Sequence, residues 1–228
     1  MSGTVVTEMA ALHDDLARRF RVATAQVTLG GRTIELLHPA SADDLISEED
    51  YVRDERLPYW ADQWPSGLVL AAHLVTKRGE GARLLELGCG TGLVATAAVL
   101  AGFDVTATDY YEDACLFTRW NAWHNTGVAI AAPPLDWRTY PDNLRRYDMV
   151  VASDVLYEPR YPEMVAAMFS RSLAPGGSAL VADPGRVALP AFLAACAARG
   201  LVAEPPLVVP WDSGEQHQQI SIFTIRHA

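Results

Sequence analysis

The 228-residue sequence is poor in cysteine and has no long hydrophobic run. Its three cysteines, Cys89, Cys115 and Cys196, are odd in number and show no Cys-x-x-Cys spacing, which argues against a disulfide framework and a structural zinc site. No stretch approaches the ~18 consecutive apolar residues that a membrane-spanning helix requires. The amino terminus also lacks the basic start and apolar core of a secretion signal. We therefore expect a cytoplasmic protein with no membrane partner.

Basic residues are scarce as well. The chain has 18 Lys and Arg against 28 Asp and Glu, which gives a formal net charge of −10. A nucleic-acid binder needs lysine and arginine to displace counterions from phosphates, so no nucleic-acid partner is expected. The charge favours a basic partner, although the same charge can serve solubility alone. The 6 histidines show no mutual metal-ligand spacing, and we predict no metal site.

The segments that are present alternate between short apolar or β-branched runs and longer helical patterns, which is typical of βαβ units and a parallel sheet. A Pro-Gly-Gly run at 175–177 is expected to close the third helix. Two extended runs at the carboxyl end predict an antiparallel hairpin through residues 210–214. The expected strands are 83–87, 104–108, 128–131, 148–152, 178–182, 201–209 and 217–226, and the expected helices are 93–101, 112–124, 160–173 and 189–198.

The first part of the chain departs from this alternation. It holds a helical pattern at 8–20 and then two alternating runs that flank Gly30-Gly31, a pair that predicts a β-hairpin. We expect residues 1–57 to form an appended lid or support and residues 58–228 to form the main domain.

The most informative segment is a glycine loop between an apolar strand and a helical pattern. Glycines at the carboxyl end of a parallel strand let the backbone approach a ligand, and the following helix offers free N–H groups. A dinucleotide fingerprint would need glycine at 93, where the chain has Leu93, and no Gly-Lys-Ser/Thr follows for a phosphate loop. The tighter loop suits a small cofactor that carries an adenosine and an amino acid. Its residues are Gly88, Cys89, Gly90, Thr91 and Gly92.

Two carboxylates accompany this loop. Asp109 ends the second expected strand, where a carboxylate can accept both hydroxyls of a ribose. Glu86 precedes the glycines and is placed to face a cationic amine of the cofactor. Each feature alone has a structural reading, since a glycine turn can serve the fold and a strand-end aspartate often caps a helix. Together, in this order, they predict a nucleoside cofactor.

The run from Glu86 to Gly92 resembles the cofactor motif of class I S-adenosylmethionine-dependent methyltransferases. Residues 58–67, with Trp60 and Trp64, are similar to the Trp-containing segment of the seven-β-strand protein-lysine methyltransferases. Residues 154–157, Asp-Val-Leu-Tyr, match the Asp-x-x-Tyr signature of that family. Residues 183–186, Asp-Pro-Gly-Arg, resemble its branch that modifies the electron-transfer flavoprotein β subunit. The similarity covers about residues 20 to 226.

This resemblance implies an α/β fold with a Rossmann-like, seven-stranded, mostly parallel sheet, helices on both faces, an antiparallel C-terminal hairpin, and a small N-terminal helix and β-hairpin extension. It implies S-adenosylmethionine as cofactor and a lysine side chain of a protein as acceptor. By similarity, Trp64 contacts the methionine end and Asp109 the ribose, and the backbone atoms of Ser153 lie near the sulfur. Tyr110 and Trp137 contact the adenine and Asp136 its exocyclic amine. For the two tryptophans, packing stays an alternative, and for Asp136 a turn role.

Asp154 and Tyr157 are the expected catalytic residues. A lysine has an unperturbed pKa of ~10.4 and must lose its proton before it attacks, whereas a nearby carboxylate favours the charged form. Asp154 is therefore expected to anchor and orient the ammonium rather than to act as a strong base. Tyr157, with Tyr59 and Trp60 as a substrate pocket, is expected to desolvate the amine and lower its pKa. As structural alternatives, Asp154 caps a turn and Tyr157 is a wall residue.

Other functions stay open at this point. A DNA or RNA adenine methyltransferase usually carries Asn/Asp-Pro-Pro-Tyr/Phe at this edge, and residues 154–157 contain no proline. A small-molecule N-methyltransferase acting on a pyridine such as nicotinamide is the main alternative, because the same aromatic pocket can stack a flat acceptor. A cofactor-binding module without turnover is the third. The sequence does not predict the oligomeric state.

Overall fold

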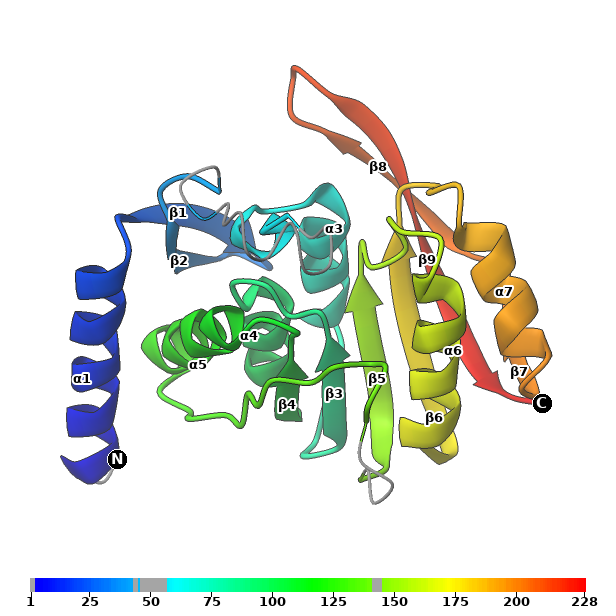
Figure 1. Ribbon diagram of the computed structural model, residues 1–228, viewed down its shortest axis with the longest axis horizontal. Coiled ribbons are helices and arrows are strands. Elements are labelled where there is room, and N and C mark those ends of the chain that lie inside the picture. The colour runs from blue at the N-terminus through cyan, green and yellow to red at the C-terminus, as the bar shows by residue number, and fades with distance from the viewer. Residues whose placement is uncertain (1–2, 43–44, 46–56, 141–144) are drawn as a thin grey trace.

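The computed structural model describes residues 3–42, 45, 57–140 and 145–228. Its centre is a seven-stranded sheet with helices on both sides (Figure 1). The strand order is β4-β3-β5-β6-β9-β7, and β8 also pairs with β9. The strands are β3 Arg83–Leu87, β4 Asp104–Thr108, β5 Tyr147–Ser153, β6 Leu173–Asp183, β7 Leu201–Ala203, β8 Leu207–Asp212 and β9 His217–His227.

The four strands β4, β3, β5 and β6 run parallel, and β9 runs antiparallel to β6, β7 and β8. Leu87 pairs with both Thr108 and Ala152, so β3, β4 and β5 end at the same edge of the sheet. Loops that leave these three strands are therefore neighbours, and this edge is where open α/β sheets bind their ligands.

The core lies on both faces of the sheet. Consecutive residues of β5 alternate, with Val151 packed among side chains of α3 (Pro65–Leu74) and α4 (Leu93–Leu100). Val150 packs on the other face with α6 (Tyr161–Ser172) and α7 (Leu189–Ala197). This alternation is what a doubly covered sheet requires. The expected fold class is confirmed.

Residues 128–131 are not a regular strand, contrary to the sequence prediction. The segment makes isolated parallel bridges, from Ala131 to Thr106 and from Pro134 to Asp109. Proline has no N–H to donate to a ladder, and Pro133 and Pro134 come after Ala132, so the pairing stays at isolated bridges and does not become a regular strand.

We had predicted that Pro175-Gly176-Gly177 closes the preceding helix. It lies inside β6 instead. Strand β6 begins directly after α6, and its register with β5 shifts between Tyr147 and Met149. A side chain at Gly177 would stand 2.8 Å from the backbone oxygen of Asp148, so glycine lets the two strands approach.

The expected strand 201–209 is also divided. Its two parts, β7 and β8, pair with the same strand β9 and are separated by Glu204-Pro205-Pro206. The residues Pro210, Trp211 and Asp212 belong to β8, and the turn follows them. Helix α3, for which we had made no prediction, begins with Pro65, a residue suited to the first position of a helix.

The amino-terminal extension consists of α1 (Gly3–Arg19) and a hairpin of β1 (Val22–Leu29) and β2 (Arg32–Pro39). The hairpin turns at Gly30-Gly31, as expected. In Figure 1 it lies above α5 (Glu112–Thr126), and the side chains of Asn121 and Asn125 of that helix complete the edge of β2. Asn121 accepts from the Leu37 N–H and donates to the Leu37 oxygen, both at 2.8 Å. The division at residues 57 and 58 stays a prediction.

The described residues hold neither a membrane-spanning helix nor a group of metal ligands. None of the helices there is long and apolar enough to cross a bilayer. Within the same parts of the chain, no three His, Cys, Asp or Glu side chains are grouped to hold a metal ion.

Candidate active site

The glycine loop connects β3 to α4 in the conformation that its sequence requires. Gly88 and Gly90 have positive φ angles of 73° and 53°, which side chains rarely adopt. A Cβ at Gly88 would lie 3.0 Å from a methyl group of Val155, and one at Gly90 would lie 3.0 Å from the backbone oxygen of Trp60. Glycine therefore keeps this stretch of backbone open toward a ligand.

Gly92 has a different task from the other two glycines. It does not line the cavity described below, and it stands at the start of α4 with a φ of 88°. A Cβ there would lie 2.7 Å from the Cα of Thr118 on α5. Gly92 thus packs α4 closely against α5, and its contact with a cofactor stays a prediction.

Asp109 and Glu86 are both buried beside the loop. The Asp109 carboxylate accepts hydrogen bonds from the N–H groups of Gly90, at 3.0 Å, and Tyr111, at 3.1 Å, so it fixes the loop to the end of β4. Glu86 is 1% exposed, and its Oε2 has no hydrogen-bond partner among the described residues. Burial, and then the charge of Asp109, raise the Glu86 pKa well above its usual range.

Cys89 completes the base of the loop. Its thiol accepts a hydrogen bond from the Thr118 hydroxyl at 3.3 Å. Burial raises the Cys89 pKa, so the side chain stays a neutral thiol, and its contribution is packing rather than nucleophilic chemistry.

Tyr110, Asp136 and Trp137 line the cavity beyond Asp109. Asp136 accepts hydrogen bonds from the backbone and the guanidinium of Arg138, the latter at distances from 2.7 to 3.0 Å. The same guanidinium lies 5.7 Å from the ring centre of Tyr110. Trp137 meets Tyr161 edge-on at 5.5 Å, and its indole Nε1 is buried without a hydrogen-bond partner in the part of the chain that the structure describes. Asp136 therefore already holds a cation.

Asp154 and Tyr157 follow β5 at the other end of the cavity. Asp154 has a φ of 55°, rare for a residue with a side chain, and its N–H donates to the Ala182 oxygen at 3.0 Å. Its carboxylate is buried and accepts hydrogen bonds from Arg186 at 2.8 Å and from the Ser66 hydroxyl at 3.3 Å.

Three aromatic side chains surround this end. The ring of Tyr59 meets that of Tyr157 at 5.4 Å and that of Trp64 at 5.9 Å, both edge-on. The Trp64 indole donates to the Tyr59 backbone oxygen at 2.9 Å. Tyr59 is 39% exposed and Tyr157 is 42% exposed, so they stand at the mouth of the cavity. We call Tyr59, Trp64 and Tyr157 the aromatic rim.

Trp60 is placed differently from the prediction that joined it to Tyr59. It is 9% exposed, and its ring packs 5.7 Å from Phe117 and 6.3 Å from Tyr111. Its backbone oxygen faces Gly90, but its ring belongs to the cluster that joins the amino-terminal extension to α5.

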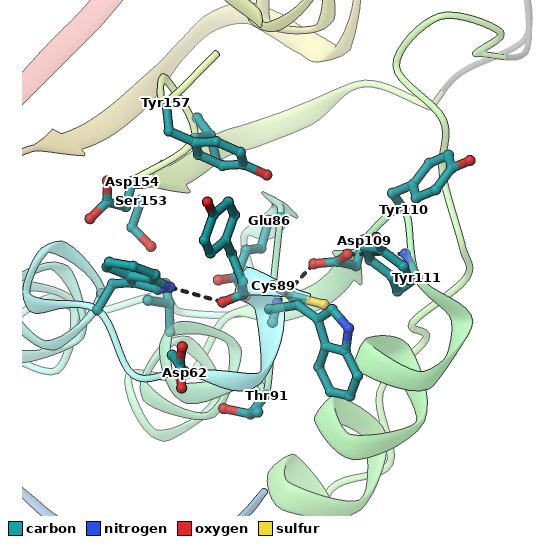
Figure 2. A pocket seen from close by; sticks show the side chains of 18 of the residues that line it. Asp62, Glu86, Cys89, Thr91, Asp109, Tyr110, Tyr111, Ser153, Asp154 and Tyr157 are labelled. Atoms are coloured by element: carbon teal, nitrogen blue, oxygen red, sulfur yellow. Dashed lines mark hydrogen bonds between the residues drawn. The ribbon is translucent and has the colours of Figure 1, made fainter. Parts of the chain in front are cut away.

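One cavity collects nearly all of these residues. Figure 2 shows Asp109 and Tyr110 on one side of it, Ser153, Asp154 and Tyr157 on the other, and Glu86 and Cys89 between them. Of the residues that the sequence singled out, those lining the cavity are Tyr59, Trp60, Trp64, Glu86, Gly88, Cys89, Gly90, Asp109, Tyr110, Asp136, Trp137, Ser153, Asp154 and Tyr157.

Several lining residues were not predicted. Gln63 donates a hydrogen bond to the Thr91 hydroxyl and ties the Trp-containing segment to the loop. Gln63 lies within residues 58–67 and Thr91 within the glycine loop, so the motifs held a signal for both. Arg186, which lines a second hollow next to this cavity, was also inside a motif, but its contact with Asp154 joins two loops far apart in sequence. Tyr161, the first residue of α6, carried no signal.

The family of the protein follows from comparison with family models. The model described as "Methyltransferase domain" matches residues 59–227, most of the chain. The chain belongs to this methyltransferase-domain family.

Named relatives and solved structures agree with this. The methyltransferase is 32% identical over 138 residues to the electron transfer flavoprotein beta subunit lysine methyltransferase of Xenopus laevis, covering 57% of this chain and 53% of that protein. It is 30% identical over 146 residues to protein N-lysine methyltransferase METTL21A of Xenopus tropicalis, covering 60% and 67%. The match covers 46% of another relative, protein-lysine N-methyltransferase rrg1 of Schizosaccharomyces pombe. The chain therefore spans about half the length of rrg1 and of the Xenopus laevis protein.

The fold is shared with precorrin-6y C5,15-methyltransferase from Geobacter metallireducens. The TM-score is 0.56 at 15% identity, over 71% of this chain and 87% of that one. Together with the family match and the named relatives, this shared fold confirms the resemblance to class I methyltransferases.

The cavity of this methyltransferase fits S-adenosylmethionine as cofactor. Two observations carry the fit: the glycine backbone at residues 88 and 90 leaves space that any side chain would fill, and Glu86 offers a buried oxygen without a donor. The amine of the cofactor can donate a hydrogen bond to Glu86, and the glycine loop can accommodate the adenosine.

Proposed function

We propose that this protein transfers a methyl group from S-adenosylmethionine to the side-chain nitrogen of a lysine in another protein. The observation that carries the proposal is the single cavity that joins the glycine loop and Asp109 to Asp154 and the aromatic rim. The names of the relatives, which include protein-lysine methyltransferases, support the choice of acceptor.

The glycine-loop end holds the cofactor in this proposal. When bound, the cofactor supplies an activated methyl group on a sulfonium. The protein therefore has to position the acceptor nitrogen in line with that methyl group and to exclude water. The backbone at Gly88 and Gly90, the Asp109 carboxylate and Glu86 would hold the cofactor, with Asp109 accepting from the ribose and Glu86 from the amine. Tyr110, Asp136 and Trp137 would hold the adenine, and Trp64 and Ser153 the methionine end.

The aromatic rim receives the acceptor. Tyr59, Trp64 and Tyr157 enclose the aliphatic part of a lysine side chain and remove water from its nitrogen, which lowers the amine pKa and favours loss of the proton. Asp154 organises this end of the cavity. The direct anchoring of the ammonium that the sequence suggests requires Arg186 to leave the Asp154 carboxylate.

The openness of the rim favours a protein acceptor over a pyridine. Tyr59 and Tyr157 remain 39% and 42% exposed, and a second hollow continues outward from them along Glu158, Arg160 and Arg186. A flat small molecule gains most binding free energy in an enclosed site that buries its surface. A lysine side chain, in contrast, can enter an open cavity from the surface of another protein. The net charge of −10 suits a basic target surface, and we keep a cytoplasmic location as part of the proposal.

Labelled cofactor tests the proposal. Incubated with a cell lysate and S-adenosylmethionine carrying a labelled methyl group, the protein should label a discrete protein band, and mass spectrometry should place the label on lysine. Asp154→Ala should bind cofactor but lose most of the transfer. Arg226→Gln, on β9 and paired with Glu204 at 2.8 Å, is the matched control that should keep it. Label found in small metabolites alone would favour the pyridine acceptor, and no calorimetric heat with the cofactor would overturn the proposal.

A further inference from the structure

The ion pair between Asp154 and Arg186 is a feature that the proposed reaction has not yet used. Arg186 Nε and Nη2 both lie 2.8 Å from Asp154 Oδ1, and Ser66 donates to Oδ2. The Asp154 side chain is 5% exposed and that of Arg186 is 34% exposed. Both carboxylate oxygens are therefore engaged, and the guanidinium stands between the carboxylate and the outside.

Arg186 is held in this place by its own loop. Asp183, the last residue of β6, is fully buried, and its Oδ1 accepts hydrogen bonds from the N–H groups of Gly185 and Arg186, both at 2.7 Å. Gly185 has a φ of 90°, which permits the tight turn. The guanidinium also lies 5.7 Å from the ring centre of Trp64 on the aromatic rim. The loop thus presents a fixed cation beside the acceptor end of the cavity.

The pairing changes the electrostatic environment of an entering amine. An uncompensated carboxylate next to a lysine stabilises the ammonium, which cannot attack, and shifts such a pKa by about 1 to 3 units. A carboxylate that already holds a guanidinium has little net charge to offer. Among the described residues, the other titratable groups around this end come from four places. They are Tyr59 from the Trp-containing segment, Tyr157, Glu158 and Arg160 after β5, Tyr161 at the start of α6, and Asp183 at the end of β6.

We infer that Arg186 is a positioning residue that neutralises Asp154, so that the acceptor lysine sits in the aromatic rim as the uncharged amine. The inference rests on the proposed function and deepens it. Asp154 then acts through its pair with Arg186 and shapes the rim, whereas direct capture of an ammonium by the carboxylate is not needed.

The pH dependence of turnover tests this role. Transfer rises with pH as the bound amine loses its proton. Arg186→Gln leaves the Asp154 charge uncompensated and should move this rising limb of kcat about 1 pH unit higher. Activity should fall about tenfold at pH values well below the amine pKa, and it should return to within about twofold of the unmodified protein once the pH exceeds the shifted pKa of the variant. Arg186→Lys should restore most of the limb. Asp154→Asn leaves the guanidinium uncompensated and should move the limb lower, whatever its effect on the maximal rate.

Two measurements separate this role from a structural one. Calorimetry should give the same cofactor affinity for Arg186→Gln as for Arg226→Gln, the exposed control on β9. An equal loss at every pH would make Arg186 structural and overturn the inference. A lower acceptor KM with an unmoved limb would show that the ammonium displaces Arg186, and would overturn it too. Both results require a wild-type protein that labels lysine; if it labels none, the proposed function itself fails and the inference with it.

Discussion

The two ends of the cavity are built in different ways. At the glycine-loop end, one continuous stretch between β3 and α4 supplies the backbone, and the neighbouring strand contributes Asp109 to fix it. At the acceptor end, side chains arrive from separate segments: Tyr59 and Trp64 before α3, Tyr157 after β5, and Arg186 after β6. The first end depends on backbone geometry and the second on side-chain contacts. Substitutions should therefore damage them differently.

Gly92→Ala should have the largest effect, because it strikes the backbone that the loop depends on. The left-handed conformation costs a side chain roughly 1–2 kcal/mol, and a Cβ placed 2.7 Å from the Thr118 Cα adds overpacking of about 1–3 kcal/mol. Thermal unfolding should show a loss of about 2–5 kcal/mol, equivalent to ~4–20 °C in Tm for a chain of this length.

Gly214→Ala is the matched control for this change. Gly214 has a similar φ of 83°, but a Cβ there would meet nothing within 4 Å. It should show the conformational cost alone. Equal losses at the two positions would mean that the contact between α4 and α5 does not restrict residue 92.

Asp109→Ala should weaken cofactor binding without touching the acceptor end. It removes two hydrogen bonds to a charged carboxylate, from Gly90 and Tyr111, besides the proposed contact with the ribose. Hydrogen bonds to charged groups contribute about 1.5–3 kcal/mol, so calorimetry should give a Kd about 10- to 100-fold higher. Asp104→Ala, at the opposite and exposed end of β4, should leave the Kd unchanged.

The same contrast explains what the sequence could predict. The glycine loop, Asp109 and the strands around them follow from local patterns, because strand periodicity and glycine spacing are properties of adjacent residues. The Asp154 and Arg186 pair could not be found in this way, since it depends on two loops meeting across the ends of β5 and β6. Trp60 was predicted together with Tyr59 for the substrate pocket; it lines the cavity, and its ring also packs in the amino-terminal cluster.

Two fold errors have a local cause that the pattern did not reveal. Residues 128–131 had an apolar pattern, but the prolines behind them end the pairing after isolated bridges. Pro175-Gly176-Gly177 was taken as a helix stop, whereas Gly177 lets β6 pass close to Asp148. Residues 46–56, part of the expected extension, lie outside the described residues.

Glu86→Gln should sharpen the comparison through pH. Burial raises the Glu86 pKa in the folded protein, so the folded state holds a proton that the unfolded state releases as pH rises. Stability of the wild-type protein without cofactor should therefore decline as pH rises above the usual glutamate range. The amide has no charge to bury, and Tm of the variant should exceed that of the wild type by a margin that grows as pH rises above the usual glutamate range. Glu204→Gln, at an exposed site, should follow the wild type; identical curves for Glu86→Gln and the wild type would contradict the expectation.

The smallest effects should come from two adjacent residues, Tyr59 and Trp60. The ring of Tyr59 belongs to the aromatic rim, and that of Trp60 packs in the amino-terminal cluster. Tyr59→Ala removes the edge-on contacts with Tyr157 and Trp64 at the mouth of the cavity and should raise the acceptor KM a few-fold, with a small loss of Tm because the ring is 39% exposed. The backbone oxygen that receives the Trp64 indole is kept. Trp60→Phe should do the reverse, lowering Tm through lost packing against Phe117 while leaving the acceptor KM unchanged. If Trp60→Phe also raised KM, the rim would extend to Trp60, and the boundary between the acceptor end and the amino-terminal cluster would have to move.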